Sequence, residues 1–168
     1  LALFLKMMSF ITLSIVFIYS RNYLLNKKLL TGEYFSLSLF ALLGVMLMIS
    51  SKNLLLMYMG LELLSLSLYA LIALNRDDKK SNEAAIKYFV LGALASGLLL
   101  YGMSMLYGLS GSLDLYTIGN IIQTQEINSE LLVFGLVFIV VGIAFKLGAV
   151  PFQMWVPDVY EGSITPVT

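Results

Sequence analysis

Residues 54–74, LLLMYMGLELLSLSLYALIAL, form an apolar run that contains one charged side chain, Glu62. A helix needs about 20 apolar residues to cross the hydrocarbon core of a bilayer, and this run has that length. An open strand cannot satisfy its backbone hydrogen bonds in lipid, whereas a helix satisfies them within itself. The run therefore predicts a transmembrane helix.

Four further apolar runs of similar length surround it, which predicts an all-α polytopic membrane protein. Of the 168 residues, 60% are hydrophobic and 12% are charged, and the mean hydropathy is +0.91. Soluble domains have about 25% charged residues, so this composition is typical of a membrane protein. We expect a single transmembrane domain over residues 1–168, in an internal piece of a longer protein. The five predicted helices cover about residues 3–20, 34–51, 53–75, 84–108 and 131–150.

The net charge and the absence of Cys and His limit which partners, cofactors and reactive side chains this chain can have. The 10 basic and 10 acidic residues cancel, so nucleic acid is not an expected partner. Cys and His are both absent, which excludes disulfides, Cys/His metal sites and thiol nucleophiles. We therefore expect no cofactor or metal on this chain, and proton chemistry must use Glu, Asp, Lys or Tyr side chains.

The connections carry an orientation signal. Loops 21–33 and 75–83 hold most of the Lys and Arg residues, whereas loop 109–130 holds none. Basic loops stay on the cytoplasmic side, so the first two are predicted inside and the third outside. Within the third loop, apolar residues at helical spacing follow Asp114, a candidate N-cap. A short helix on the outer surface and an ordered loop are both open interpretations.

Glu62 lies near the middle of its predicted span. A charged side chain there costs at least about 2.5–3.5 kcal/mol, so it should be paired or face the protein interior. Tyr58, Ser65 and Tyr69 lie four residues before, three after and seven after it, and share its helix face. The carboxyl either stays protonated and stabilises the bundle or exchanges a proton.

Two lysines also lie in apolar runs. Lys87, near the basic end of its span, either reaches toward Glu62 or extends to the inner surface. Lys146 shares a small-residue face with Gly142, and Pro151 follows it. Because proline removes a backbone donor and blocks the turn before it, the fifth span is expected to be discontinuous beside this lysine. The other interpretation is that the span ends near residue 150 and Lys146 extends to the surface.

The tail after Pro151 is neither a clean span nor a polar loop. Trp155 suits a membrane interface. Asp158 and Glu161 are a weak metal signal, and we prefer helix capping or contact with a neighbouring loop for them.

Three motifs carry a family resemblance, in order and with consistent spacing. The chain resembles the subunit N family of proton-pumping NADH–quinone oxidoreductase (respiratory complex I), from about residue 20 to the end. The resemblance implies an antiporter-like fold of about fourteen helices built from two inverted five-helix repeats, with most of the first repeat in this chain. The motifs are GLELLSLSLYALIAL (60–74), AAIKYFVLGALASGLLLYGMSMLYGLSGSLDL (84–115) and GIAFKLGAVPFQMWVPDVYEGSITPVT (142–168).

The resemblance also implies roles in proton translocation. Glu62 would pair with Lys87, and Lys146 would be a central proton carrier at a broken helix. NADH, FMN, iron–sulfur clusters and quinone would bind other subunits of the complex. Gln153 departs from the family pattern, which has His there, and glutamine cannot titrate.

The same resemblance implies the surroundings of the chain. Its partners would be other membrane subunits of the complex, protons, internal water and the lipid bilayer. A bacterial inner membrane is expected, with an organellar inner membrane or thylakoid as alternatives. A subunit of a multisubunit Na⁺/H⁺ antiporter or of a membrane-bound hydrogenase is the alternative function.

Overall fold

A computed structural model describes residues 1–124 and 128–168, and these residues form helices without a regular strand. Five of the helices are long and apolar enough to cross a membrane, namely α1, α2, α3, α4 and α6. The prediction of five spans is confirmed. The elements are α1 (Ala2–Asn26), α2 (Gly32–Ser50), α3 (Leu54–Ile72), α4 (Lys79–Ser110), α5 (Leu115–Thr124), α6 (Ser129–Lys146), the 3₁₀ turn η1 (Gln153–Trp155) and α7 (Val156–Gly162).

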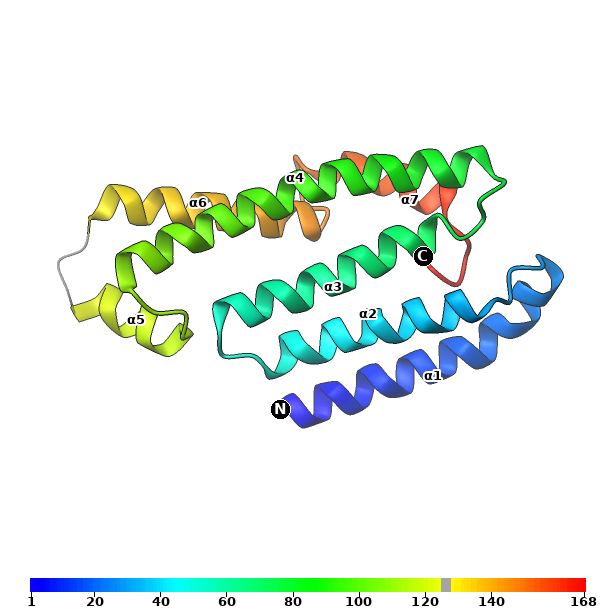
Figure 1. Cartoon of the computed structure of the whole chain (residues 1–168), viewed down its shortest axis with the longest axis horizontal. Coiled ribbons are helices and arrows are strands. Elements are labelled where there is room, and N and C mark those ends of the chain that lie inside the picture. Colours follow the sequence, from blue (N-terminus) through cyan, green and yellow to red (C-terminus); the bar gives the residue numbers. More distant parts are fainter. Residues whose placement is uncertain (125–127) are drawn as a thin grey trace.

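The helices α1, α2 and α3 lie side by side in chain order, and α4 runs along α6 and α7 (Figure 1). Small residues allow the closest helix contacts. A Cβ atom on Gly44 of α2 would lie 2.5 Å from the carbonyl oxygen of Gly60 on α3. A Cβ atom on Gly102 of α4 would lie 2.6 Å from the carbonyl oxygen of Gly135 on α6. These glycines allow the close approach of α2 to α3 and of α4 to α6.

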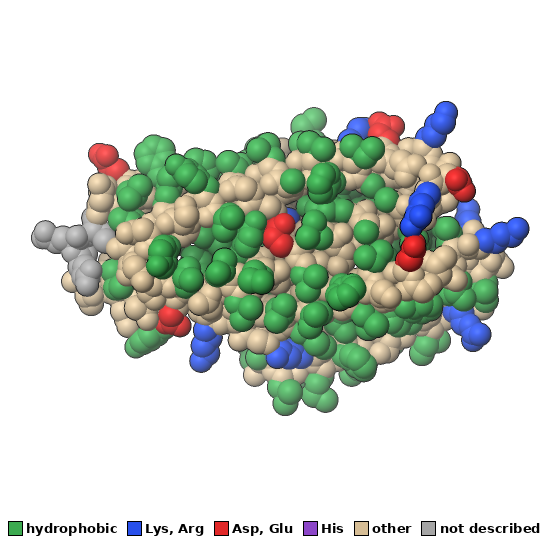
Figure 2. All heavy atoms as spheres, in the orientation of Figure 1, with side chains coloured by type: hydrophobic (Ala, Val, Ile, Leu, Met, Phe, Trp, Pro, Cys, Tyr) green, Lys and Arg blue, Asp and Glu red, His purple; other side chains and the backbone are tan. Residues whose placement is uncertain are grey.

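The basic connections lie at the same end of the bundle. Arg76, between α3 and α4, forms an ion pair of 3.0 Å with Glu33 at the start of α2. Lys and Arg side chains gather at this end, on the right in Figure 2. At the opposite end, Leu54 N–H donates to the Leu113 carbonyl at 2.8 Å, which joins the other two connections. This arrangement has the predicted alternation of basic and non-basic ends.

Of the two interpretations left open for the segment after Asp114, the structure has the short helix, α5. The Asp114 carboxylate accepts hydrogen bonds of 2.9 Å from the backbone N–H and the hydroxyl of Thr117. These hydrogen bonds hold the pKa of the Asp114 carboxyl below its usual value. Its position on the outer membrane surface stays a prediction.

The helices extend past the predicted spans where charged residues follow. The helix α1 continues to Asn26, and α4 begins at Lys79, where the Asp78 side chain accepts from the Lys80 N–H. Apolarity marks the part of a helix that lies in lipid, whereas capping residues mark where the helix ends. The predicted start of the fourth helix at residue 84 was therefore late.

The helix α6 ends at Lys146, four residues before the predicted end of that span. Gly148 has φ of +63°, in the left-handed region, and its N–H donates to the Phe145 carbonyl at 3.0 Å. Ala149 N–H donates to the Ala144 carbonyl at 2.9 Å, which completes a Schellman-type helix end. The predicted discontinuity is confirmed, since the chain continues along α4 as η1 and α7 (Figure 1). Its attribution to Pro151 was wrong, because the helix ends at a glycine before the proline.

Candidate functional site

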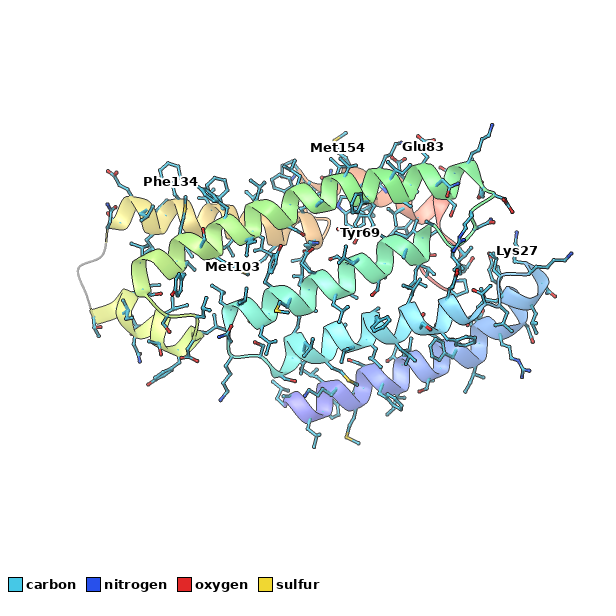
Figure 3. All side chains as sticks on the ribbon, in the orientation of Figure 1. Lys27, Tyr69, Glu83, Met103, Phe134 and Met154 are labelled. Atoms are coloured by element: carbon cyan, nitrogen blue, oxygen red, sulfur yellow. The ribbon has the colours of Figure 1, made fainter. Side chains whose placement is uncertain are left out.

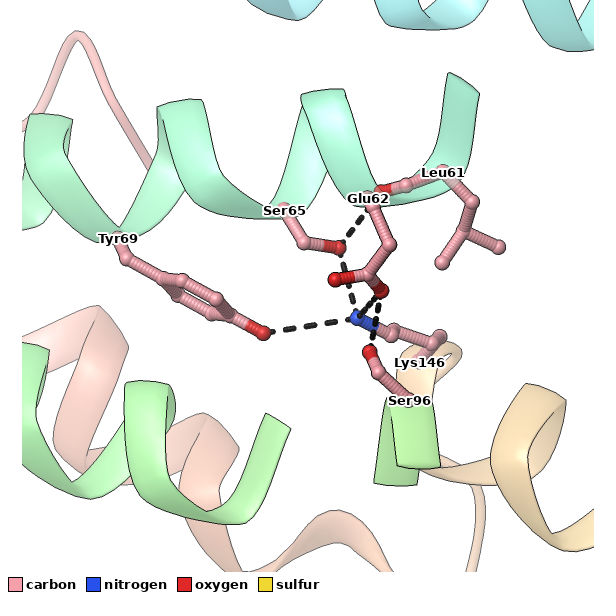
Figure 4. A network of polar contacts seen from close by, with 6 residues as sticks. All are labelled: Leu61, Glu62, Ser65, Tyr69, Ser96 and Lys146. Carbon is pink, nitrogen blue, oxygen red and sulfur yellow. Dashed lines mark hydrogen bonds and ion pairs between the residues drawn. The ribbon is translucent and has the colours of Figure 1, made fainter. Parts of the chain in front are cut away.

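Lys146, the last residue of α6, points into the space between α3, α4 and α6 (Figure 4). Its side chain is 10% exposed. The ammonium nitrogen Nζ lies 2.7 Å from the Ser65 hydroxyl oxygen and 3.5 Å from Glu62 Oε1. A third partner, the Tyr69 hydroxyl, lies at 3.5 Å. The side chain therefore does not extend to a membrane surface, and that interpretation is wrong.

Glu62, on α3, is held by the two neighbouring helices. The Ser96 hydroxyl of α4 donates to Glu62 Oε1, the same oxygen that faces Lys146 (Figure 4). The Ser65 hydroxyl donates its own proton to the Leu61 carbonyl at 2.8 Å. Ser65 can therefore only accept from Lys146, whereas Ser96 donates to Glu62. The network joins one ammonium, one carboxylate and three hydroxyls.

The helix interruption places Lys146 at the network. The Phe145 carbonyl, which accepts from the Gly148 N–H at the end of α6, also accepts a hydrogen bond of 3.1 Å from the Trp155 indole N–H. Trp155 stacks on Tyr88 of α4 with ring centroids 4.3 Å apart. The Trp155 ring packs between α4 and the end of α6, and its position at a membrane interface stays a prediction.

The predicted supporting residues have different positions. Ser65 and Tyr69 join the network, and Tyr69 points from α3 toward α4 (Figure 3). Tyr58 is partly buried, and its hydroxyl forms no hydrogen bond within the described ranges. Gly142 allows α6 to pack on α4, since its Cβ would lie 2.7 Å from Leu99 Cβ. Pro151 lies in the turn after α6, outside the network.

Lys87 lies in a separate cluster at the basic end. Its Nζ forms ion pairs of 2.8 Å with Glu83 and 2.9 Å with Asp158, and its side chain is 44% exposed. The implied pairing of Lys87 with Glu62 is wrong in this structure. Ser96 is the α4 residue at Glu62, and it lies nine positions beyond Lys87, or about 13 Å along the helix.

The acidic residues of α7 take part in this basic-end cluster. Glu161 pairs with Lys80 at 2.6 Å, and Asp158 pairs with Lys87, so two ion pairs join α7 to α4. A cavity of about 190 Å³ lies among these side chains. Asp158 and Glu161 therefore contact lysines of the helix α4, and not the neighbouring loop or helix cap that was preferred from the sequence.

Sequence reasoning missed one polar residue of the site, and it named Gln153 only for its departure from the family pattern. Ser96 was not predicted, although it is the polar side chain within the small-residue run LGALASG (91–97), and that position was its signal. Gln153 Oε1 is buried and has no hydrogen-bond partner among the described residues. Gln153 is the first residue of η1, the turn that follows the helix interruption and packs against α4.

The network can hold a proton in more than one place. An amine and a carboxylate share it, and the hydroxyls of Ser96 and Tyr69 can donate or accept. Low polarity around the groups strengthens each electrostatic interaction relative to water. A change of charge nearby can therefore move a proton between Lys146 and its partners.

A family model described as "NADH:quinone oxidoreductase/Mrp antiporter, TM" matches residues 51–168. NADH-quinone oxidoreductase subunit N of Polaromonas naphthalenivorans is 59% identical over 165 residues, which cover 98% of this chain and 33% of that protein. The subunit N of Methylovorus glucosotrophus is 56% identical over 164 residues, covering 98% and 34%. The chain thus spans about a third of the length of the curated relatives it matches.

Two solved structures share the fold. One is respiratory complex I from Thermus thermophilus with bound aureothin, with a TM-score of 0.70 and 43% identity, over 82% of this chain and 30% of that chain. The other is the archaeal membrane-bound sulfane sulfur reductase, with a TM-score of 0.72 and 32% identity, over 79% and 26%.

Proposed function

The chain belongs to the NADH:quinone oxidoreductase/Mrp antiporter transmembrane family, and from that premise we propose that it is part of a proton-translocating subunit N of NADH–quinone oxidoreductase. The chain is an integral membrane protein of the bacterial inner membrane, as its five apolar helices and bacterial relatives indicate. Its redox reaction would take place on other subunits, which carry NADH, FMN, iron–sulfur clusters and quinone.

The observation that carries the proposal is the Lys146–Glu62 pair at the end of an interrupted helix. Its nitrogen and oxygen lie 3.5 Å apart, with the lysine side chain 10% exposed. Ionisable groups inside a membrane are costly and face the bundle interior when they carry protons or ions. An interrupted helix beside such groups is a recurring arrangement in transport proteins.

In the proposed mechanism, Lys146 holds a proton and Glu62 tunes how firmly it is held. A charge change in a neighbouring membrane subunit acts on Glu62, and the proton then leaves Lys146 through internal water and hydroxyl groups. Moving one charge against the membrane potential costs about 2.3 kcal/mol per 100 mV, so the path must be closed to leakage. Gln153 cannot titrate, so we give it no part in carrying the proton.

Lys87 has a place in the proposal at the basic end of the bundle. Through Asp158 it joins α4 to the segment that follows the interruption. We assign it to the inner end of the path, where the cavity among Lys80, Glu83 and Asp158 opens. The fourteen-helix fold and the inverted repeat belong to the same proposal, since about two thirds of the length of the relatives lies outside this chain.

The test uses the whole complex reconstituted in vesicles. Lys146→Ala and Glu62→Ala should each lower the rate of NADH-driven proton pumping by at least about tenfold, which corresponds to about 1.4 kcal/mol in the barrier. Lys52→Ala, at the exposed α2–α3 turn, is the matched lysine control and should pump normally. Normal pumping by both site variants would reject the relay and leave the charges with a structural role.

The antiporter and hydrogenase alternative is not favoured by the relatives, which are 56–59% identical and named NADH-quinone oxidoreductase subunit N. The same vesicles distinguish it. Pumping that depends on external Na⁺ and continues without NADH would support an antiporter, whereas pumping that requires NADH and is indifferent to Na⁺ supports the proposal.

A further inference from the structure

The face of α4 that contacts the network contains two residues with no assigned role, Gly92 and Ser96. They lie one turn apart, so they share a face. Ser96 donates to Glu62, and Gly92 contacts the Tyr69 hydroxyl. Both Glu62 and Tyr69 face Lys146 from α3.

Ser96 differs from other serines in the helices because it donates to a side chain of another helix, whereas Ser81, which also donates from α4 to α3, reaches the Ile72 backbone carbonyl. Ser9, Ser38 and Ser67 donate to the carbonyl four residues earlier in their own helix. This is the usual arrangement for a serine in an apolar helix, because it satisfies the hydroxyl locally. Ser96, which is 4% exposed, donates across to another helix. Its hydroxyl therefore donates to the Glu62 carboxylate rather than to a carbonyl of its own helix.

This hydrogen bond affects the distance between Glu62 and Lys146. Ser96 and Lys146 both contact the same oxygen of Glu62, Oε1. The Lys146 nitrogen lies 3.5 Å from this oxygen, which is longer than the usual N–H···O distance of about 2.9 Å. Lys146 approaches Ser65 more closely, at 2.7 Å. Two serines on different helices thus hold the carboxylate and the ammonium near each other but not in full contact.

Gly92 affects the position of the Tyr69 hydroxyl, the third partner of Lys146. A Cβ atom at this position would overlap the Tyr69 hydroxyl. The Tyr69 ring cannot easily move aside, because it packs edge-on against Tyr88 and Phe89 with centroids 4.7 Å and 5.6 Å away. The missing side chain at Gly92 therefore creates the space in which the hydroxyl reaches Lys146.

We propose that Gly92 and Ser96 are positioning residues for proton transfer, through which α4 sets the separation of Lys146 from Glu62 and Tyr69. Ser96 holds the carboxylate back from a close ion pair that would retain the proton. Gly92 admits the tyrosine hydroxyl as an alternative partner. This inference rests on the proposed function of Lys146.

Ser96→Ala in the intact complex tests the first part. Pumping per NADH should fall by about tenfold, and its pH dependence should move, because the carboxylate near Lys146 is released. Ser104→Ala, an exposed serine on the same helix that bonds its own backbone, should match the wild type in both measurements. Ser96→Thr keeps the hydroxyl and should restore the wild-type pH dependence per assembled complex, even if less complex assembles.

A wild-type rate and pH dependence in Ser96→Ala would overturn the positioning role. A lower rate with an unmoved pH dependence would also overturn it, since that is the result of packing alone. Failure of the proposed function is separate. If Lys146→Ala stops pumping while Ser96→Ala behaves as the wild type, only the positioning inference fails.

A double-mutant cycle tests the second part. Gly92→Ala should lower pumping, and Gly92→Ala combined with Tyr69→Leu should pump as Tyr69→Leu alone, because leucine lacks the hydroxyl, Cζ and Cε1 atoms that the new Cβ would meet. Losses that add in the double variant would mean that Gly92 acts through helix packing and would overturn its role toward Tyr69.

Discussion

Two groups of lysines and carboxylates lie on either side of the helix interruption, one inside the bundle and one at its basic end. In the inner group, Lys146 and Glu62 are 3.5 Å apart, with side chains 10% and 23% exposed. In the outer group, Lys87 and Asp158 are 2.9 Å apart, and both side chains are 44% exposed. The shorter ion pair is therefore the more accessible one.

The difference shows that distance does not rank these pairs by importance. Water screens charges at an exposed pair and replaces a lost partner, so such pairs contribute little. Removing one partner of a buried pair leaves an uncompensated charge and typically costs about 3–5 kcal/mol. The longer Lys146–Glu62 pair has less water near it to replace a lost partner. It should therefore dominate both the retention of the proton and the stability of the protein.

Exchanging charges should separate the two groups most strongly. The buried exchange Glu62→Lys with Lys146→Glu should lower pumping by at least about 100-fold, because glutamate is shorter than lysine and Ser65 has no free proton to donate to it. The exposed exchange Lys80→Glu with Glu161→Lys should keep pumping within about twofold of the wild type, since the same attraction is restored in an open setting.

The single variants complete this experiment. Lys80→Glu and Glu161→Lys each place like charges together and should lower the amount of assembled complex, which the exchange then recovers. If the buried exchange pumps normally, the orientation of the hydroxyls around Lys146 is not important. If the exposed exchange also abolishes pumping, exposure to water does not distinguish the two groups.

The sequence predicted the helices and their charged residues better than the contacts that these residues make with other helices. Apolar runs are long enough to identify every span, and a charge inside such a run is conspicuous, so Glu62 and Lys146 could be selected from the sequence. The face of α3 with Ser65 and Tyr69 also followed from helical spacing. These inferences depend on one helix at a time.

Contacts between helices could not be obtained in this way. The register of α4 against α3 places Ser96 rather than Lys87 at Glu62, and that register depends on close glycine contacts such as Gly92 with Tyr69. The helix end at Gly148 was also missed, because Pro151 is the stronger signal in the sequence. A left-handed glycine is visible only once the backbone is known.

Gly148→Ala should affect both groups, since this residue lies between them. An alanine in the left-handed region costs about 1–2 kcal/mol, and its Cβ would also lie 2.8 Å from Val156 Cγ2 at the start of α7. The thermal inactivation midpoint of the complex and the pumping per NADH should both fall, because the end of α6 and α7 move apart.

Gly111→Ala is the matched control for strain. Gly111 has the same φ of +63°, but nothing lies within 4 Å of its added Cβ. It should lower the inactivation midpoint and leave pumping per assembled complex unchanged. Equal pumping losses in the two variants would mean that the contact between Gly148 and α7 does not position Lys146.

Lys87→Met should have a smaller effect on stability than Gly148→Ala, although the ion pairs of Lys87 are shorter than that of Lys146. Methionine keeps most of the apolar stem, and the carboxylates of Glu83 and Asp158 stay accessible to water through the cavity that they line. The thermal inactivation midpoint should therefore shift by no more than about 2 °C. Lys80→Met, at a side chain that is 71% exposed, should shift it even less. A loss for Lys87→Met as large as for Gly148→Ala would show that the outer group is shielded in the complete protein, and the two groups would then differ in position alone.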